Sequence, residues 1–281
     1  MNKILCPVDL EPPSKNAVCY AAHLAQKTGA TLFLLHVEPE ISTEGVNDEI
    51  EKQKLFDLRQ KMADFCHQIQ TNFEINCEYI IKPSYFEETI ITIANEQGFD
   101  LIVMGTEGIS DFEDFVFGTF TLKVVKHSKP PVLVVPAEWH NYTPEKFIYA
   151  SDYDEYDPIF IRKVVDLAIV LHAKVIYLHI SKHGETFGDE LFEVSSEEIK
   201  EELGAKSEYV QFEHMYDEGG TVKALKRYLQ KFESGVVVVL KKERSVIGNL
   251  FHRSLTKKLT LAAKMPLLVF HRYRTKQFPK K

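Results

Sequence analysis

Hydrophobic and polar positions along the chain form two kinds of segment that alternate from one end to the other. Short, continuous apolar runs rich in β-branched residues predict buried parallel strands, and longer stretches with helical periodicity predict the crossover helices between them. In the first half the predicted strands are 3–8, 31–37, 75–82, 100–104 and 131–135. The predicted helices are 14–28, 46–71, 85–97 and 117–127. This order is typical of an α/β fold with a parallel sheet.

The same pattern begins again in the second half. Lys146 to Asp152 matches Lys3 to Asp9 at an offset of 143 in residue number. Toward the end of each half, the segment 236–270 matches the segment 101–135 without a gap at an offset of 135. Because the offset becomes smaller along the chain, we expect the second copy to be shorter in its second helix and the preceding loop.

A repeat of this length indicates a duplicated domain rather than a solenoid unit. We therefore predict two tandem, doubly wound, parallel five-stranded sheets of the Rossmann-like kind. The predicted domains are 1–137 and 145–272, followed by a basic tail at 273–281. The connector begins near Ala137, where both periodicities break.

Charge and cysteine content narrow the choice of partners and compartment. The sequence has 34 Lys and Arg against 41 Asp and Glu, a net charge of −7, which opposes binding to nucleic acid or to an anionic membrane. We expect the basic segment from Arg272 onward to be a solvated tail. The four cysteines have no CxxC spacing, and neither a signal peptide nor an apolar run long enough to span a membrane is present, which favours a cytoplasmic protein.

The segment after the fourth strand carries the most informative pattern in the chain. Gly105 and Gly108 follow the buried strand, and after nine further residues Gly118 and Thr119 open the last helix of the first half. Glycines at such a turn let the backbone approach a ligand, and a helix N-terminus with free N–H groups suits a phosphate. A plain turn followed by a capped helix would use the same residues, so the spacing leaves both interpretations open.

Together these features resemble the universal stress protein family in its tandem, two-domain form. The resemblance rests on the first strand with Asp9, on Leu35-His36-Val37, on the spacing G-x-x-G, nine residues, G-[ST], and on the last strand at 131–136. It covers nearly the whole chain. It implies a fold of the adenine nucleotide alpha hydrolase-like kind that binds ATP.

The resemblance also implies a set of nucleotide-binding positions. The glycine segment would hold the phosphates and ribose, and Asp9 would fix the nucleoside end, with the adenine near Pro7 and Val37. The implied positions in this chain are Pro7, Asp9, Val37, Met104, Gly105, Gly108, Gly118, Thr119 and Phe120.

Acidic residues in the same segment depart from the family pattern. Glu107 stands between the two glycines, where the family usually has a His or Arg, and Asp111, Glu113 and Asp114 follow. Carboxylates near a triphosphate repel it by about 1 kcal/mol per pair at about 4 Å even in bulk water. Either a divalent cation such as Mg²⁺ bridges the two, or the carboxylates point into solvent.

The second copy lacks the glycines. Leu240, Glu243 and Arg253 stand at the positions of Gly105, Gly108 and Gly118, so we predict that this half binds no nucleotide. Arg244, Arg253 and Lys241 still suit a different anionic ligand. Gly219 and Gly220 precede a predicted helix at 221–233, where we expect a turn leading into that helix rather than an anion site.

Other candidate chemistry is weaker. His36 and His179 occupy matching places in apolar strands and are expected to be hydrogen-bonded core or rim residues. No group of residues has metal-ligand spacing, and no G-x-S-x-G, P-loop or early G-x-G-x-x-G motif occurs. We therefore expect no enzyme, or at most slow ATP hydrolysis without a placed general base.

The sequence thus favours a stress-response binding protein that holds ATP in residues 1–137 and uses its second half as a partner within the same chain. In that arrangement strands 132–135 and 267–270 would pair and cover two apolar edges. Homo-oligomers also fit. The alternative is a nucleotide-free interaction module that docks partners through the acidic 107–114 loop.

Overall fold

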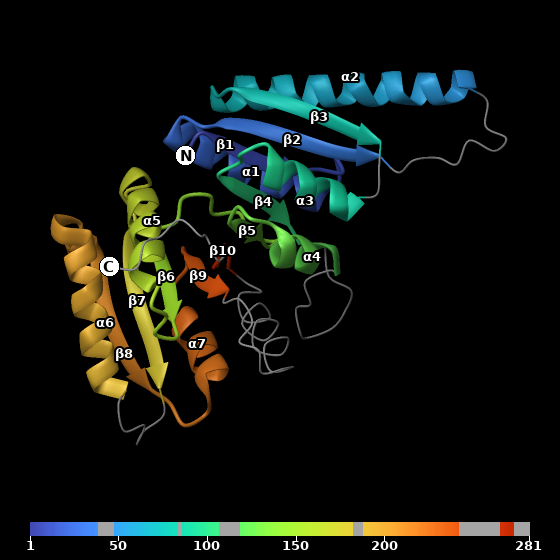
Figure 1. Cartoon of the computed structure of the whole chain (residues 1–281). Coiled ribbons are helices and arrows are strands. Elements are labelled where there is room, and N and C mark those ends of the chain that lie inside the picture. Colours follow the sequence, from blue (N-terminus) through green and yellow to red (C-terminus); the bar gives the residue numbers. More distant parts are fainter. Residues whose placement is uncertain (39–47, 84–85, 107–118, 182–187, 242–264, 273–281) are drawn as a thin grey trace. The chain divides into compact units, whose positions relative to one another are not determined.

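The computed structural model describes residues 1–38, 48–83, 86–106, 119–181, 188–241 and 265–272. The described chain forms two compact units, one within residues 1–137 and the other from Glu138 onward (Figure 1). Each unit is built around a parallel β-sheet with helices on both faces.

In the first unit the predicted strands and helices are confirmed, with ends that differ by at most two positions. The strands are β1 (Lys3–Pro7), β2 (Thr31–Glu38), β3 (Cys77–Pro83), β4 (Leu101–Gly105) and β5 (Val132–Val135). The helices are α1 (Pro12–Thr28), α2 (Asp48–Phe73), α3 (Phe86–Glu96) and α4 (Thr119–His127). The strand order is β3-β2-β1-β4-β5, and every neighbouring pair is parallel.

The second unit repeats this arrangement. Its strands are β6 (Lys146–Ser151), β7 (Lys174–Ser181), β8 (Val210–Tyr216), β9 (Val236–Lys241) and β10 (Leu267–His271). Its helices are α5 (Asp157–Val170), α6 (Gly188–Leu203), the short 3-10 helix η1 (Gly204–Tyr209) and α7 (Thr221–Leu229), which ends earlier than the predicted helix 221–233. The strand order is β10-β9-β6-β7-β8, which is the order of the first unit read in the other direction.

The strand registers confirm the internal repeat residue by residue. Lys3 is opposite Thr31 in the first unit, and Lys146 is opposite Lys174 in the second, so both partners move by 143. Ile102 is opposite Val132, and Val237 is opposite Leu267, so here both partners move by 135. The second helix is shorter as predicted, because α2 has 26 residues and α6 has 16, whereas the loop before it lies outside the described residues.

The sheets are covered on both faces, which explains why their strands are apolar without alternation. Ile4, Leu5 and Cys6 are successive residues of β1, and each is 0% exposed. The helix covering is visible in Figure 1, where α1 and α2 lie on one side of the first sheet and α3 on the other. Burying each such Leu or Ile contributes about 1.5–3 kcal/mol.

The helix ends preserve the repeat in backbone conformation. Gly29 ends α1 with φ +71°, and the corresponding residue after α5 is His172, with φ +54°. Leu10 and Tyr153 also correspond, with φ +68° and +54°. The fold therefore requires a left-handed residue at these two places, whether or not glycine occupies them. Before α7, Gly220 adopts φ +89° as its N-cap, which confirms the turn expected at Gly219-Gly220.

No helix in the described part of the chain is long and apolar enough to cross a membrane. The longest, α2, has 26 residues, but charged side chains are distributed along its length.

The corresponding left-handed residues Gly29 and His172 can be tested by two substitutions that should change the free energy of unfolding in opposite directions. A Cβ in the left-handed region costs about 1–2 kcal/mol. Gly29→Ala should therefore lower the free energy of unfolding by about 1 kcal/mol, and His172→Gly should raise it by a smaller amount because glycine also loses more backbone entropy on folding. Urea unfolding followed by circular dichroism measures both. If both variants changed the free energy of unfolding in the same direction, the structural equivalence of Gly29 and His172 would be contradicted.

Candidate nucleotide site and the corresponding edge of the second unit

The carboxyl ends of β1 and β4 define the candidate site of the first unit. From β1 the chain proceeds to β2 and β3 on one side, and from β4 to β5 on the other, so the strand order reverses between β1 and β4. Ligands of open α/β sheets bind in the crevice at such a reversal. The loop after β1 contains Asp9, and the glycine segment begins at the last residue of β4, Gly105.

Asp9 is exposed and is oriented by the first turn of α1. Its Oδ1 accepts hydrogen bonds from the Glu11 N–H at 2.9 Å and from the Ser14 hydroxyl at 2.5 Å. The Ser14 hydroxyl also lies 3.0 Å from the Glu11 carbonyl. The two prolines that begin α1 lack an N–H, and the contacts come instead from the N–H of the N-cap residue Glu11 and from the Ser14 hydroxyl. The carboxylate is thus held at the edge of the sheet beside a helix N-terminus.

The other expected site residues differ in burial, and some of them lie outside the described residues. Pro7, Val37 and Met104 are buried in the first unit, with Val37 1% and Met104 2% exposed, whereas Gly105 is half-buried at the end of β4. Phe120 lies in the first turn of α4 and is half-buried. Thr119 begins α4, and Gly108, Gly118 and the acidic positions 107, 111, 113 and 114 lie outside the described residues.

Two polar residues that the sequence analysis did not single out make hydrogen bonds at this carboxyl edge of the first sheet. Thr106 is 2% exposed; its N–H donates to the Val135 carbonyl at 3.1 Å, and its Oγ1 accepts from the Ala137 N–H at 3.3 Å. Asn16 donates from Nδ2 to the carbonyls of Pro136 and Ala137, both at 3.1 Å. These bonds tie the end of β4 and α1 to the chain after β5. Nothing in the local sequence distinguishes either residue, because their partners are distant in the chain.

The two strand histidines have the structural role predicted for them. His36 is 8% exposed, and its Nδ1 lies 2.8 Å from the Val8 carbonyl oxygen. In the second unit, His179 Nδ1 lies 2.9 Å from the Ser151 carbonyl oxygen. The sequence separation is the same in both pairs. Each imidazole therefore donates a hydrogen bond that anchors the carboxyl end of the first strand of its unit.

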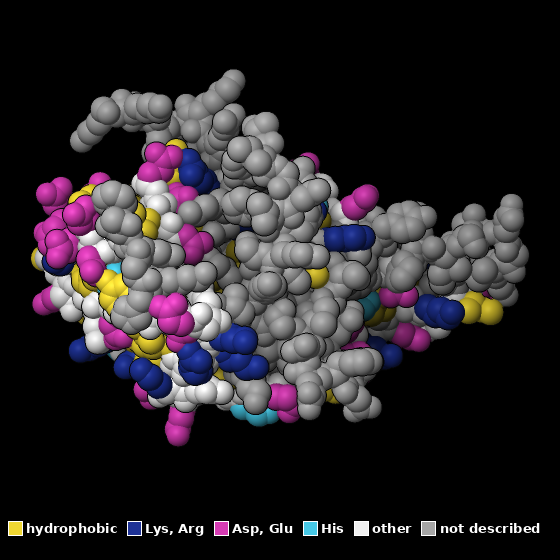
Figure 2. Space-filling model, turned by 90° about the horizontal axis from the view of Figure 1, so that it is seen from below, with side chains coloured by type: hydrophobic (Ala, Val, Ile, Leu, Met, Phe, Trp, Pro, Cys, Tyr) yellow, Lys and Arg dark blue, Asp and Glu magenta, His cyan; other side chains and the backbone are white. Residues whose placement is uncertain are grey.

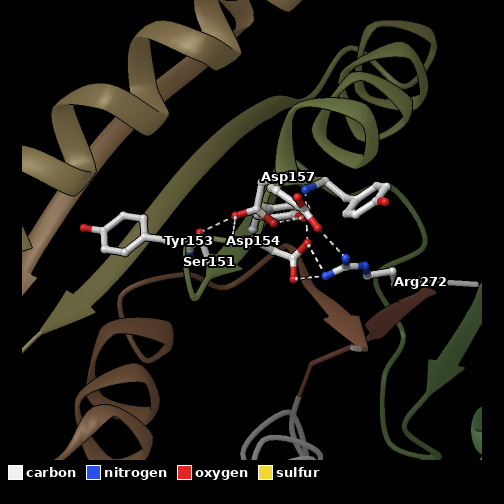
Figure 3. Close-up of polar contacts among 8 residues, drawn as sticks. Ser151, Tyr153, Asp154, Asp157 and Arg272 are labelled. Atoms are coloured by element: carbon white, nitrogen blue, oxygen red, sulfur yellow. Dashed lines mark hydrogen bonds and ion pairs between the residues drawn. The ribbon is translucent and has the colours of Figure 1, made fainter. Parts of the chain in front are cut away.

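The equivalent edge of the second unit carries a buried polar network (Figure 3). Asp157 is 1% exposed and accepts hydrogen bonds from the Tyr149 hydroxyl at 2.8 Å and the Ser151 hydroxyl at 2.5 Å. The Tyr177 hydroxyl lies 2.8 Å from the Ser151 oxygen. Burial raises the pKa of Asp157 above its ordinary value of 3.8, although hydrogen bonds from Ser151 and Tyr149 act in the opposite direction.

Arg272 closes this edge from the end of β10. One of its guanidinium nitrogens lies 3.3 Å from an Asp154 carboxylate oxygen, another lies 2.5 Å from Glu155, and the guanidinium is 4.1 Å from the centre of the Tyr156 ring. Figure 3 shows Arg272 reaching toward Asp154 beside the Asp157 network. The expectation of a solvated tail beginning at Arg272 is therefore wrong, because a buried carboxylate and a tyrosine face hold this residue within the second unit. The rest of the predicted tail, 273–281, lies outside the described residues.

The two edges differ in chemistry although the backbone is the same. At the offset of 143, the polar Tyr149, Ser151 and Asp157 correspond to Cys6, Val8 and Ser14 of the first unit. Ser14 is half-buried whereas Asp157 is 1% exposed, so the second unit fills this part of its edge with its own hydrogen-bonded side chains. No group of three or more His, Cys, Asp or Glu in the described ranges is arranged to hold a metal ion.

The residues that replace the three glycines are only partly described. Leu240 lies in β9, next to the strand's last residue, Lys241, and it is half-buried. Positions 243, 244 and 253 lie outside the described residues. An anion site formed by the basic residues of this segment therefore stays a prediction.

A comparison with protein families identifies the first unit. Its residues 1–136 match the model of the universal stress protein family. Residues 1–136 therefore form a domain of the universal stress protein family. The universal stress protein YxiE of Bacillus subtilis is 28% identical over 150 residues, which cover 48% of this chain and 98% of that protein.

Solved structures extend the likeness to the whole chain at the level of fold. The crystal structure of a universal stress protein from Archaeoglobus fulgidus covers 97% of this chain and 99% of its own, with a TM-score of 0.78 and 17% identity. A universal stress protein family protein from Arabidopsis thaliana, crystallised with AMP bound, covers 48% of this chain and 92% of its own, with 20% identity and a TM-score of 0.36. The structure from Archaeoglobus fulgidus shows that the whole chain has the α/β fold.

The raised pKa of Asp157 makes stability depend on pH. Because the native pKa lies above 3.8, the native state binds more protons than the unfolded state just above that pH, so this carboxyl lowers stability as pH rises through its native pKa. Asp157→Asn removes the titration. The unfolding free energy of the variant relative to the wild type should therefore increase between about pH 4 and about pH 7, as measured by urea unfolding. A difference that stays constant with pH would contradict the assignment.

Proposed function

We propose that the first unit binds an adenine nucleotide, ATP, at the carboxyl edge of β1 and β4. The observation that carries the proposal is that Asp9 follows β1 and Gly105 ends β4, the two strands that flank the reversal of strand order. Family membership of residues 1–136 supports it. The spacing of Gly105, Gly108 and Gly118 supplies the phosphate-binding part.

The roles within the site follow from the chemistry of the groups. Asp9 accepts hydrogen bonds from the hydroxyls at the nucleoside end of the nucleotide. Pro7, Val37 and Met104 lie on the adenine side of the binding site. The backbone of Gly105, Gly108 and Gly118, with Thr119 and the Phe120 amide, contacts the phosphates. Glu107 and the three acidic residues after it require a divalent cation, Mg²⁺, between carboxylate and phosphate if they face the ligand.

The second unit has a different part in the proposal. Its side chains at the positions of the three glycines, Leu240, Glu243 and Arg253, would stand where phosphate lies in the first unit. We therefore propose that it binds no nucleotide and serves as a partner within the same chain, with strands 132–135 and 267–270 pairing. We propose binding and regulation rather than ATP turnover for the first unit, in a cytoplasmic stress response.

Isothermal titration with ATP and Mg²⁺ tests the nucleotide site. The wild type should bind ATP at a stoichiometry of one per chain, and Gly118→Arg should abolish binding because it puts a cationic side chain in the space of a phosphate. Arg253 is the counterpart of Gly118 at the offset of 135, so Arg253→Gly is the matched control and should leave binding unchanged.

The outcomes separate the two functional classes. Repeating the titration with EDTA in place of Mg²⁺ shows whether a cation offsets the acidic residues, and AMP in place of ATP shows how much the phosphates contribute. Absence of binding at millimolar ATP would overturn the proposal and favour the nucleotide-free interaction module. Two sites per chain would contradict the assignment of the second unit.

A further inference from the structure

A serine, a histidine and an aspartate meet at the carboxyl edge of the second unit, outside the network around Asp157. The Ser181 hydroxyl lies 2.7 Å from Nε2 of His214, and Nδ1 of His214 lies 3.0 Å from an Asp189 carboxylate oxygen. Ser181 is the last residue of β7, His214 lies in β8, and Asp189 is in the first turn of α6. The three residues belong to neighbouring elements of one unit.

The sheet geometry explains how they meet. Ser181 is opposite Tyr216, and His179 is opposite His214. Since side chains two residues apart on a strand share a face, all four side chains lie on the same face of the sheet. Helix α6 packs on this face, because its Phe192 stacks on His214 with ring centres 5.0 Å apart. Asp189, one turn before Phe192, therefore reaches the imidazole.

The contacts assign the single proton of the neutral His214 imidazole to one of its two nitrogens. Nδ1 faces a carboxylate and carries the hydrogen, which leaves Nε2 to accept the hydrogen of the Ser181 hydroxyl. Asp189 also accepts a hydrogen bond from the Tyr216 hydroxyl, which fixes its carboxylate beside His214. This order, hydroxyl to imidazole to carboxylate, is the arrangement that activates a serine as a nucleophile, and it occurs on unrelated folds.

The start of α6 adds donors for a developing negative charge. A Cβ placed on Gly188, the first residue of α6, would lie 3.4 Å from the Ser181 hydroxyl oxygen, so the N-terminus of the helix is directly against the nucleophile. The first N–H groups of a helix have no acceptor within the helix. Within this proposal they would serve as donors to an oxyanion formed at an acyl carbon bonded to Ser181.

We propose that Ser181, His214 and Asp189 form a hydrolytic site for small, neutral carboxylic esters. Ser181 is 4% exposed and the His214 side chain 9%, so little of the reacting groups is open to solvent and a small acyl group suits the site better than a large one. Aromatic rings of Phe192 and Tyr216 border the imidazole, with Tyr216 4.6 Å from it. These rings suit an apolar acyl or alcohol group.

The surface charge excludes anionic esters. Helix α6 carries seven Asp and Glu and one Lys. Figure 2 shows acidic side chains gathered along the left-hand edge of the molecule, the side on which Figure 1 places α6. An anionic substrate would approach this field against repulsion, whereas a neutral ester would not.

The proposed reaction is hydrolysis of the ester, with water as the second substrate. Ser181 Oγ bonds to the ester carbonyl carbon while its proton moves to His214 Nε2. The bond from that carbon to the alcohol oxygen then breaks, and His214 returns the proton to the leaving alcohol. Water attacks the acyl-serine while His214 takes its proton. The bond from the acyl carbon to Ser181 Oγ then breaks and His214 returns the proton to Oγ, which releases the carboxylic acid and restores Ser181.

The first unit provides an internal comparison. At the offset of 143 Ser181 corresponds to Glu38, and the register places Ile81 where the second unit has His214. Neither a nucleophile nor an imidazole therefore occupies these two positions of the first unit. The proposed activity belongs to the second unit and does not depend on nucleotide binding.

Labelling with diisopropyl fluorophosphate tests the nucleophile directly, because it joins phosphorus to an activated serine and releases fluoride. The full-length chain should be modified at Ser181, as located by peptide mass spectrometry, and should hydrolyse p-nitrophenyl acetate. Ser181→Ala should lose both, and His214→Gln should slow both by about a hundredfold or more. Ser195→Ala is the matched control, since the Ser195 hydroxyl on α6 pairs with the Tyr177 hydroxyl at 2.6 Å rather than with an imidazole.

Asp189 is expected to act by positioning His214, which calls for a conservative variant. Asp189→Asn should slow labelling, and Asp189→Glu should restore most of it because the carboxylate is retained. Thermal unfolding of each variant shows whether the fold persists. Unmodified Ser181 in the wild type, equal labelling rates in wild type and His214→Gln, or the same loss in Ser195→Ala would each overturn the proposal.

Discussion

Parallel pairing of strands is the constraint on which the other features of this protein depend. Parallel strands require a crossover connection, and α1, α2 and α3 in the first unit are such connections, each returning the chain to the opposite end of the sheet. All carboxyl ends of a sheet consequently lie at one edge. Asp9 and Gly105, which are far apart in the sequence, lie at that same edge because β1 and β4 are neighbours. The same constraint brings Ser181 and His214 together through β7 and β8.

Duplication has kept the backbone of this arrangement and changed the chemistry at its edge. The bond between a strand histidine and the carbonyl at the end of the first strand is present in both units, at 2.8 and 2.9 Å. The left-handed residues after the first helix are also kept, as Gly29 and His172. Between these fixed points the side chains diverge: the first unit has Cys6, Val8 and Ser14 at the positions where the second unit buries Asp157 under the hydroxyls of Tyr149 and Ser151. A shared scaffold therefore supports two edges of different polarity.

Sequence reasoning succeeded wherever the signal was local or periodic. The apolar runs located the strands, because strands buried on both faces tolerate few polar residues, and the repeat located matching elements in both halves. The core or rim role of His36 and His179 also followed from their place within apolar strands. Sequence reasoning failed where a partner is distant in the chain. Thr106, Asn16 and the contact of Arg272 with Asp154 are such cases, and a search for short nucleophile motifs could not find Ser181, His214 and Asp189, which come from three elements.

The amino-acid sequence by itself determined the α/β class, the duplication and the family of the first unit, because each depends on periodicity or on motifs within one continuous segment. The tertiary structure decided which side chains share an edge and which hydrogen bonds they make. That depends on strand order and register, and these bring residues into contact from positions that the sequence leaves far apart. The polar edge of the second unit is the result that only this arrangement could supply.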